Sequence, residues 1–417
     1  MEDVLEQINQ AAKGAFPNSI TKYKSVNVLL LSWEDDDLGV EGDVLELKKL
    51  FVSGYGFDAE HWKIPSMKPD FKLSSKLLDF VTTHETPDPR DSLLIIYYAG
   101  HGYLNPQRQS VWSCRSWNPY EFSSNPVEVE PPSVEWHAHE AICSKAEMDV
   151  LFLYDCCSAA GSASKLTKKG IKEVIAASGF ETWAPGELEH SFTRALIQVL
   201  GSLSRARPFT VASLHQRVLE KLQRWSPQID GTQFRTVASD GRLTDIERRK
   251  TPVHIALNQQ PDYYHSSIQL VGLLAQQPGD SSMRSDERFA RWKDGTADYT
   301  DVIISLRIQA KHNLEPEQIA EWIRDVPMLA MSIKVHAVVH TSATLVLLAI
   351  PVAVWDLLPA NVPCSFVGFA NTSNLMFGKE HLFIWDEEER MRWHSDSRQH
   401  YLVHKDRPCA TDNLRKW

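Results

Sequence analysis

The 417-residue sequence lacks a long apolar run, because no stretch approaches the roughly 20 consecutive apolar residues that a membrane-spanning helix needs. Its start, MEDVLEQINQAAKGAF, is acidic and helix-like. It has neither the basic segment nor the apolar segment of a secretory signal peptide. We therefore expect a cytoplasmic chain that does not enter a membrane.

Excess positive charge is also missing, since the net charge is −10 and the pI is near 5.9. Nucleic acid binding needs a basic surface, so we expect no nucleic acid partner, whereas basic peptides would be attracted. Six cysteines in a chain of this length do not make a disulfide framework, and we expect free thiols. The sequence shows no internal repeat and no EF-hand loop.

The composition is that of an ordinary globular protein, with 43% hydrophobic and 24% charged residues. The length exceeds what one core usually holds, so we predict two domains. The polar, turn-rich stretch LLAQQPGDSSMRSDERF is the candidate linker. The predicted divisions are an N-terminal helical extension at 1–24, a first domain at 25–275, a linker at 276–290 and a C-terminal domain at 291–417.

Apolar runs of strand length alternate with helical segments in the first domain. These runs are SVNVLLLSW, DSLLIIYYAGHG, MDVLFLYDCC and IKEVIAASG. Strands that are apolar almost throughout are typical of a mostly parallel sheet covered by helices on both faces. The sequence therefore predicts an α/β fold for this domain.

The C-terminal segment has a different order of elements. DVIISLRI, EPEQIAEWIRDV, LAMSIKVHAVVH, SATLVLLAI, VAVWDLL and SFVGFA read as strand, helix, strand, strand, helix and strand. That order is the ferredoxin-like pattern of a smaller α+β domain. Such folds host many functions, so a regulatory role, a protein partner or self-association is the default expectation here.

Two polar motifs stand where buried strands end, and in parallel sheets such positions gather binding groups. His101 lies between two glycines, and Cys156 and Cys157 follow a later strand. A cysteine attacks a carbonyl only as a thiolate, so it needs a base such as His101 nearby. The order and the spacing of about 55 residues are those of caspase-type proteases. Gly102 or a cysteine N–H would supply the oxyanion hole, although each motif alone is also typical of a turn or of core packing.

The motifs YYAGHG and LFLYDCCSAAG resemble the histidine and cysteine motifs of the caspase and metacaspase clan. The likeness extends over NVLLLSWEDDDLGVEGDVLELKKLF and VIAASGFETWAPGELEHSFTRAL, and it is greatest to fungal metacaspase-like proteins. It implies a caspase-haemoglobinase fold for 25–275. It also implies a cysteine endopeptidase acting on polypeptides, with a role in proteolytic signalling or regulated cell death (apoptosis).

The resemblance makes the two thiols unequal. The register of Asp155-Cys156-Cys157 implies that Cys157 is the nucleophile and His101 the catalytic base. Strand alternation agrees that only one of two adjacent side chains can face the histidine, which leaves Cys156 as a packing residue. The sequence departs from metacaspases after the nucleophile, where Ser-Ala-Ala replaces His-Ser-Gly.

The resemblance also implies cleavage after Arg or Lys. Asp155 takes the place that metacaspases use in the S1 pocket, and Asp36 is the candidate from the acidic first loop, Glu34–Asp37. A carboxylate in the pocket would pair with a guanidinium or ammonium group. The alternative for the acidic run is a solvated loop or a helix N-terminus.

Family members often cut themselves after the nucleophile strand, so Lys165, Lys168 and Lys169 are candidate self-processing sites of a zymogen; an ordinary basic loop is the alternative. We expect no cofactor and no bound metal, although the resemblance allows calcium dependence. The histidines of EWHAHE lack a further ligand for zinc. Two other readings remain open, an inactive caspase-fold adaptor or signalling scaffold and a redox switch at Cys156-Cys157.

Overall fold

The structure is a computed structural model. It describes residues 2–17, 23–117, 130–156, 169–177, 191–204, 208–224, 251–257, 265–273, 301–308, 334–340, 344–359 and 361–370. These residues belong to one compact unit that ends at Asn371. The predicted linker at 276–290 lies outside the described residues.

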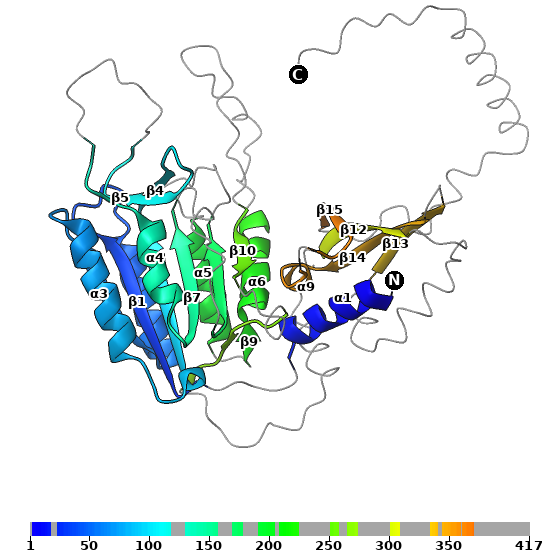
Figure 1. The fold of residues 1–417 in the computed structure, drawn as a ribbon, viewed down its shortest axis with the longest axis horizontal. Coiled ribbons are helices and arrows are strands. Elements are labelled where there is room, and N and C mark those ends of the chain that lie inside the picture. Colours follow the sequence, from blue (N-terminus) through cyan, green and yellow to red (C-terminus); the bar gives the residue numbers. More distant parts are fainter. Residues whose placement is uncertain are drawn as a thin grey trace, which may run out of the picture. The chain divides into compact units, whose positions relative to one another are not determined.

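The larger sheet has six strands in the order β10-β8-β7-β3-β1-β2 (Figure 1). Every neighbouring pair is parallel except β10 and β8, which are antiparallel. The strands are β1 (Ser25–Trp33), β2 (Asp58–Ile64), β3 (Ser92–Ala99), β7 (Asp149–Asp155), β8 (Lys172–Ala176) and β10 (Val253–Ala256).

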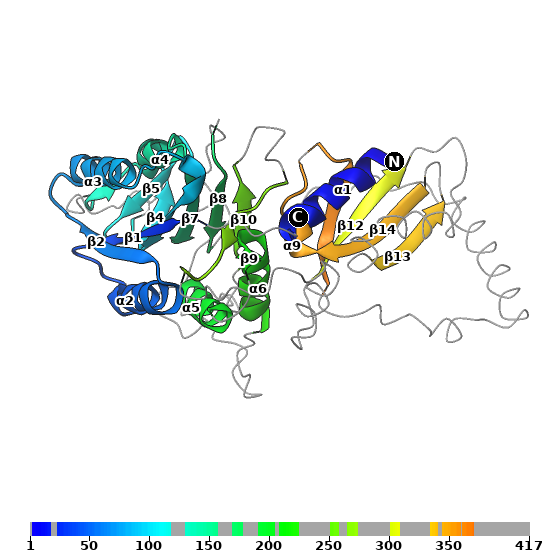
Figure 2. The same ribbon diagram turned by 90° about the horizontal axis from the view of Figure 1, so that it is seen from below.

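Helices cover both faces of this sheet, as Figure 2 shows. One apolar cluster joins the sheet to α2 (Glu41–Leu50), α5 (Phe192–Leu203) and α6 (Val211–Arg224). A second cluster joins the opposite face to α3 (Pro69–Thr83) and α4 (Trp136–Ser144). All eight residues of β3 are buried, which explains its uninterrupted apolar sequence.

A small antiparallel sheet in the order β4-β5-β6 stands at the end of β3. Its strands are β4 (His101–Leu104), β5 (Ser110–Ser113) and β6 (Ser133–Val134). The run DSLLIIYYAGHG is thus two strands, which are separated by Gly100. This ribbon holds Trp112, which is fully buried beside the candidate site.

A second sheet of four strands follows in the order β13-β14-β12-β15. Its strands are β12 (Asp301–Ile308), β13 (Lys334–His340), β14 (Thr344–Pro351) and β15 (Cys364–Ala370). All neighbours are antiparallel, and the last strand returns beside the first. This is the strand arrangement of the predicted ferredoxin-like pattern. The predicted helix at EPEQIAEWIRDV lies outside the described residues, and the short second helix is α9 (Val352–Trp355).

The first helix, α1 (Glu2–Ala15), packs on this second sheet although it begins the chain. Its buried residues Ile8, Ala11, Ala12 and Ala15 belong to the same apolar cluster as the core of β12, β14 and α9. The predicted fold class, a mostly parallel sheet flanked by helices with a smaller α+β part, is therefore confirmed. Within the described part of the chain, no helix is both long and apolar enough to cross a membrane.

Candidate active site

The strand ends that carry the two motifs are immediate neighbours. Strands β3 and β7 run parallel, and Ala99 pairs with Asp155 at their last position. The backbone N–H of Gly100 then donates to the carbonyl of Asp155 at 3.3 Å. The strand ends that carry the histidine and cysteine motifs are therefore adjacent in the sheet.

Gly100 allows the chain to leave the sheet at this point. Its φ of +153° lies in the region that favours glycine. A Cβ atom on Gly100 would lie only 2.5 Å from the hydroxyl oxygen of Tyr98. The same hydroxyl donates to the carbonyl of His101 at 2.8 Å, which fixes the first peptide after the turn. The glycine is therefore required by both backbone conformation and close packing.

The ring of His101 is held by a carboxylate from the loop after β1. Its Nε2 lies 2.7 Å from Oδ1 of Asp37, and the His101 side chain is only 18% exposed. Strand β1 is the direct neighbour of β3, which brings this loop to the histidine. Sequence reasoning named Asp37 only as part of an acidic pocket loop. The neighbouring strand order is the signal that would have assigned it to His101.

Two other acids of this loop, Asp35 and Asp36, have local partners. Asp36 accepts a hydrogen bond from the backbone N–H of Val40 at 3.0 Å, just before α2 begins. Asp35 accepts one from the hydroxyl of Ser66 at 2.5 Å. Asp36 thus shapes the entry to a helix, which was the alternative for the acidic run, and its pocket role stays a prediction.

Asp155 ends β7 and contacts the first turn of α5. Its Oδ2 accepts hydrogen bonds from the backbone N–H and the hydroxyl of Thr193, at 3.2 and 2.6 Å. A carboxylate at a helix N-terminus is stabilised by the helix dipole. The side chain is half-buried at the carboxyl end of β7. Its geometry is compatible with the predicted S1 role, which stays a prediction.

Among the described residues beside Asp155, carboxylates outnumber cationic groups. Arg194 pairs with Asp43 at 2.5 Å and with Glu46 at 2.6 Å. Burial raises the pKa of Asp43, and the charges of Asp155 and Glu46 raise it further while Arg194 opposes them. Two carboxylates therefore pair with one guanidinium group, and the charge of Asp155 also acts on Asp43.

Cys156 lies in the core, as strand alternation predicts. It is 1% exposed and belongs to the same apolar cluster as Tyr154, whereas Asp155 between them points to the α5 side. Cys157 lies outside the described residues. Its role as nucleophile stays a prediction.

Of the remaining predicted site residues, Gly102 lies near these strand ends, Lys169 lies at the opposite end of the sheet, and two fall outside the described residues. Gly102 stands in β4 opposite Trp112, and its oxyanion role stays a prediction. Lys169 is exposed and forms an ion pair with Glu147. Lys165 and Lys168 lie outside the described residues, and self-processing is likewise untested.

A buried stack of aromatic rings packs beside the strand ends. The rings of Tyr98 and Trp112 are 3.8 Å apart, and those of Trp112 and Trp136 are 3.7 Å apart. The Trp33 indole N–H donates to the Tyr98 hydroxyl at 3.0 Å. Burial raises the pKa of Tyr98 well above its usual value, so its hydroxyl remains a neutral donor to the histidine peptide.

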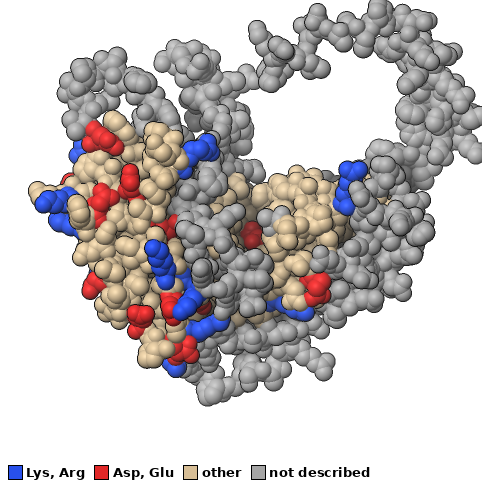
Figure 3. Space-filling view, in the orientation of Figure 1, with Lys and Arg blue, Asp and Glu red and all other residues tan. Residues whose placement is uncertain are grey.

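The EWHAHE histidines do not converge on a metal site. His139 contacts Ser74 and Asp70 of α3, each at 3.0 Å. Burial raises the pKa of Cys143 to about 12, so it stays a neutral thiol. On the face in Figure 3, basic and acidic side chains are interspersed over the described surface.

Neither a family model nor a curated protein matches the chain. Among solved structures, a crystal structure of caspase-1 from Spodoptera frugiperda is similar, with 12% identity and a TM-score of 0.36. The alignment covers 57% of this chain and 89% of that chain. Because this score is low, the fold assignment rests on strand order and direction. These define an α/β protein with a mostly parallel six-stranded sheet and a smaller antiparallel sheet.

Proposed function

We propose that the chain is a cysteine endopeptidase of the caspase and metacaspase type, with Cys157 as nucleophile and His101 as general base. The pairing of Ala99 with Asp155 carries this proposal. The two paired residues stand on adjacent strands about 5 Å apart. His101 and Cys157 each follow that pair by two residues in the sequence, so the proposal brings an imidazole and a thiol to adjacent strand ends.

Asp37 has a defined place in this chemistry. If Nε2 of His101 donates to Asp37, the lone pair of Nδ1 is left to take the thiol proton. The thiolate attacks the substrate carbonyl, and the protonated ring then gives its proton to the leaving amine. Water releases the acyl-enzyme. Asp37 acts here as a positioning residue that also stabilises the charged ring.

Cleavage after Arg or Lys is the specificity that the charges favour. Asp155 has one oxygen engaged by Thr193, and its other oxygen is the atom that would meet a cationic substrate side chain. The excess of carboxylates around Arg194 also favours an incoming cation. Gly102 as oxyanion donor and Asp36 as a second pocket acid complete the proposed site.

Peptide-library cleavage tests this function. We compare the parent with Cys157→Ala and Cys156→Ala, with and without calcium. The parent and Cys156→Ala should cut after Arg or Lys, whereas Cys157→Ala should be inactive. Undiminished activity of Cys157→Ala, or cleavage only after Asp, would contradict the proposal. Absence of all cleavage would favour the adaptor alternative, which the Ser-Ala-Ala departure motivates.

A further inference from the structure

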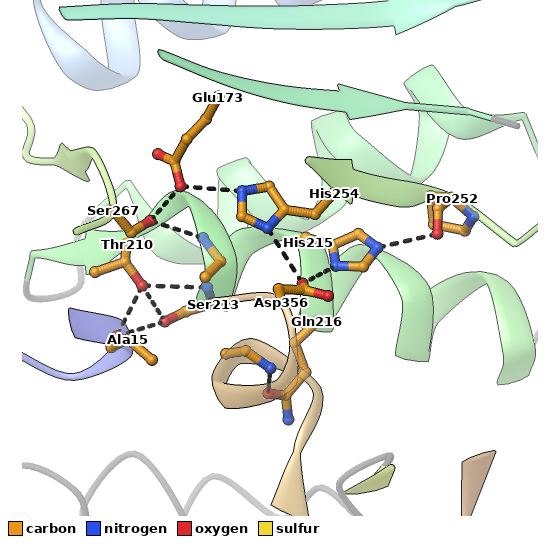
Figure 4. A network of polar contacts seen from close by, with 12 residues as sticks. Ala15, Glu173, Thr210, Ser213, His215, Gln216, Pro252, His254, Ser267 and Asp356 are labelled. Atoms are coloured by element: carbon orange, nitrogen blue, oxygen red, sulfur yellow. Dashed lines mark hydrogen bonds and ion pairs between the residues drawn. The ribbon is translucent and has the colours of Figure 1, made fainter. Parts of the chain in front are cut away.

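A second cluster of ionisable side chains lies far from the strand-end motifs in the sequence. His215 comes from α6, His254 from β10, and Asp356 follows α9. The Asp356 Oδ2 atom lies 2.5 Å from Nδ1 of His215 and 3.3 Å from Nδ1 of His254. All three side chains are at least nine-tenths buried. Figure 4 shows both rings pointing at this one carboxylate.

The outer nitrogen of each ring is fixed by an acceptor. His215 Nε2 lies 3.0 Å from the carbonyl oxygen of Pro252, and His254 Nε2 lies 3.0 Å from Oε1 of Glu173. A carbonyl oxygen can only accept, so Nε2 of His215 must carry a proton. Glu173 also accepts from the hydroxyl of Ser267 and the N–H of Ile268, as an ionised carboxylate does. Both rings therefore turn Nδ1 toward Asp356 (Figure 4).

This arrangement calls for positive charge beside the buried carboxylates. An unprotonated Nδ1 would face the Asp356 oxygen with its lone pair and repel it. Asp356 and Glu173 are also two buried carboxylates that need compensation. Two ring protons would supply the charges, and so would one divalent cation shared by the three inner atoms.

We propose that His215, His254 and Asp356 form a zinc site. Two imidazole nitrogens and one carboxylate oxygen are a common zinc ligand set, with water as the fourth ligand. The three donor atoms lie within 4.8 Å of one another, so a modest widening admits an ion about 2 Å from each. Zinc-binding histidines typically donate their outer N–H to a carboxylate or a backbone carbonyl. Glu173 and Pro252 are such partners.

The surrounding structure holds the ligands in place. The side chain of Gln216, next to His215, accepts the N–H of Ala353 at 3.1 Å, which ties α6 to α9. The zinc would therefore link two parts of the chain. One part is β10, a strand of the larger sheet, with α6, which packs on that sheet; the other is α9, which packs on the smaller sheet. We infer a structural ion that joins these elements.

Metal binding to the full chain tests the site. We use a Cys157→Ala background, so that the proposed active-site thiol cannot bind metal, and remove metal with a chelator. Zn²⁺ and the spectroscopic probe Co²⁺ are titrated by calorimetry and absorption, and metal analysis of the purified chain covers Fe²⁺, which the same donor set also serves. We expect one Zn²⁺ per chain and a raised melting temperature.

The variants identify the ligands. His215→Ala and Asp356→Asn should weaken binding at least tenfold, and Glu173→Gln about 10- to 100-fold. The control is His265→Asn, because His265 lies nearby, against Leu357 and Gln7, without joining the cluster. If the parent chain binds neither ion stoichiometrically and its melting temperature does not change, the cluster is held by protons alone and the proposal is wrong. Equal binding by parent and Asp356→Asn would also overturn it. The parent titration stands even if a variant does not fold.

Discussion

A single surface carboxylate decides how His101 is oriented. Asp37 is 47% exposed, whereas the ring that it contacts is only 18% exposed. Water can partly replace an exposed partner, so the contact should affect catalysis less than a fully buried one. We therefore expect substitution of Asp37 to lower catalytic activity measurably without abolishing it.

Asp37→Asn should lower kcat about 10- to 100-fold with little change in KM, because the amide cannot stabilise the charged ring. Steady-state kinetics on an Arg peptide measures both constants. Asp35→Asn is the matched control, since Asp35 contacts Ser66 and not the histidine. Equal kinetics of parent and Asp37→Asn would show that the carboxylate does not position His101.

Lys172 should make the free energy of unfolding of the chain depend on pH. Burial lowers its pKa to about 8 from 10.5, although Asp149 opposes this effect. Between those values the unfolded chain binds more protons than the folded one, so the free energy of unfolding rises with pH. The unfavourable burial of the charged amine is present in full below pH 8.

Chemical denaturation of the parent and Lys172→Met at pH 7.5 and pH 10 tests this effect. The parent should gain up to about 3 kcal/mol relative to the variant as the pH rises. Lys169→Met is the matched control, since Lys169 is an exposed lysine. A pH-independent difference between parent and Lys172→Met would contradict the shift.

At the scale of elements, the turn between β3 and β4 is the most constrained feature of the candidate site. Gly100 combines a positive φ with a contact to Tyr98 that leaves no room for a Cβ atom. Gly42 in α2 is a matched comparison, since a Cβ there would meet no atom within 4 Å. The two glycines should therefore respond oppositely to the same substitution.

Gly100→Ala should cost at least about 2 kcal/mol of stability and displace His101, with loss of most activity. Gly42→Ala should stabilise the chain by about 0.5–1 kcal/mol, because alanine is favoured inside a helix. Thermal unfolding and peptide cleavage measure both effects. Unaltered activity of a folded Gly100→Ala chain would show that the turn does not determine the position of His101.

The sequence predicts best those elements whose side chains are buried on both sides. Strand β3 is almost entirely apolar and β1 is mostly so, and both were predicted. The same reasoning misses β5 and β6, because strands of four and two residues are too short to show an alternation of apolar and polar residues. The stacking partners of Trp112 come from separate elements, so only the folded chain identifies the aromatic support of the site.

At the scale of the whole molecule, α1 joins the start of the chain to a sheet that begins at residue 301. Periodicity predicts the helix but cannot say which surface covers its apolar face. The proposed zinc cluster was unpredictable for the same reason, because it is formed only by folding. His215 and Asp356 are 141 residues apart and belong to no sequence motif. The order of the second sheet was predictable because it follows from the sequence of its elements.

Ile8→Ala should destabilise the chain by about 2–4 kcal/mol, because Ile8 is fully buried in the core of the second sheet. Lys13→Ala on the exposed side of α1 should have little effect. Chemical denaturation followed by circular dichroism compares the two. Equal stability of the parent and Ile8→Ala would show that α1 does not form part of this core.

Covalent labelling of the thiols tests the central claim most directly. The full chain is treated with an arginyl ketone inhibitor, with and without calcium, and the modified residue is located by peptide mass spectrometry. The account predicts stoichiometric labelling of Cys157, none of the buried Cys156, and loss of labelling in Asp155→Ala. A chain in which Cys157 stays unmodified under both conditions, or in which an aspartyl ketone reacts instead, would contradict it.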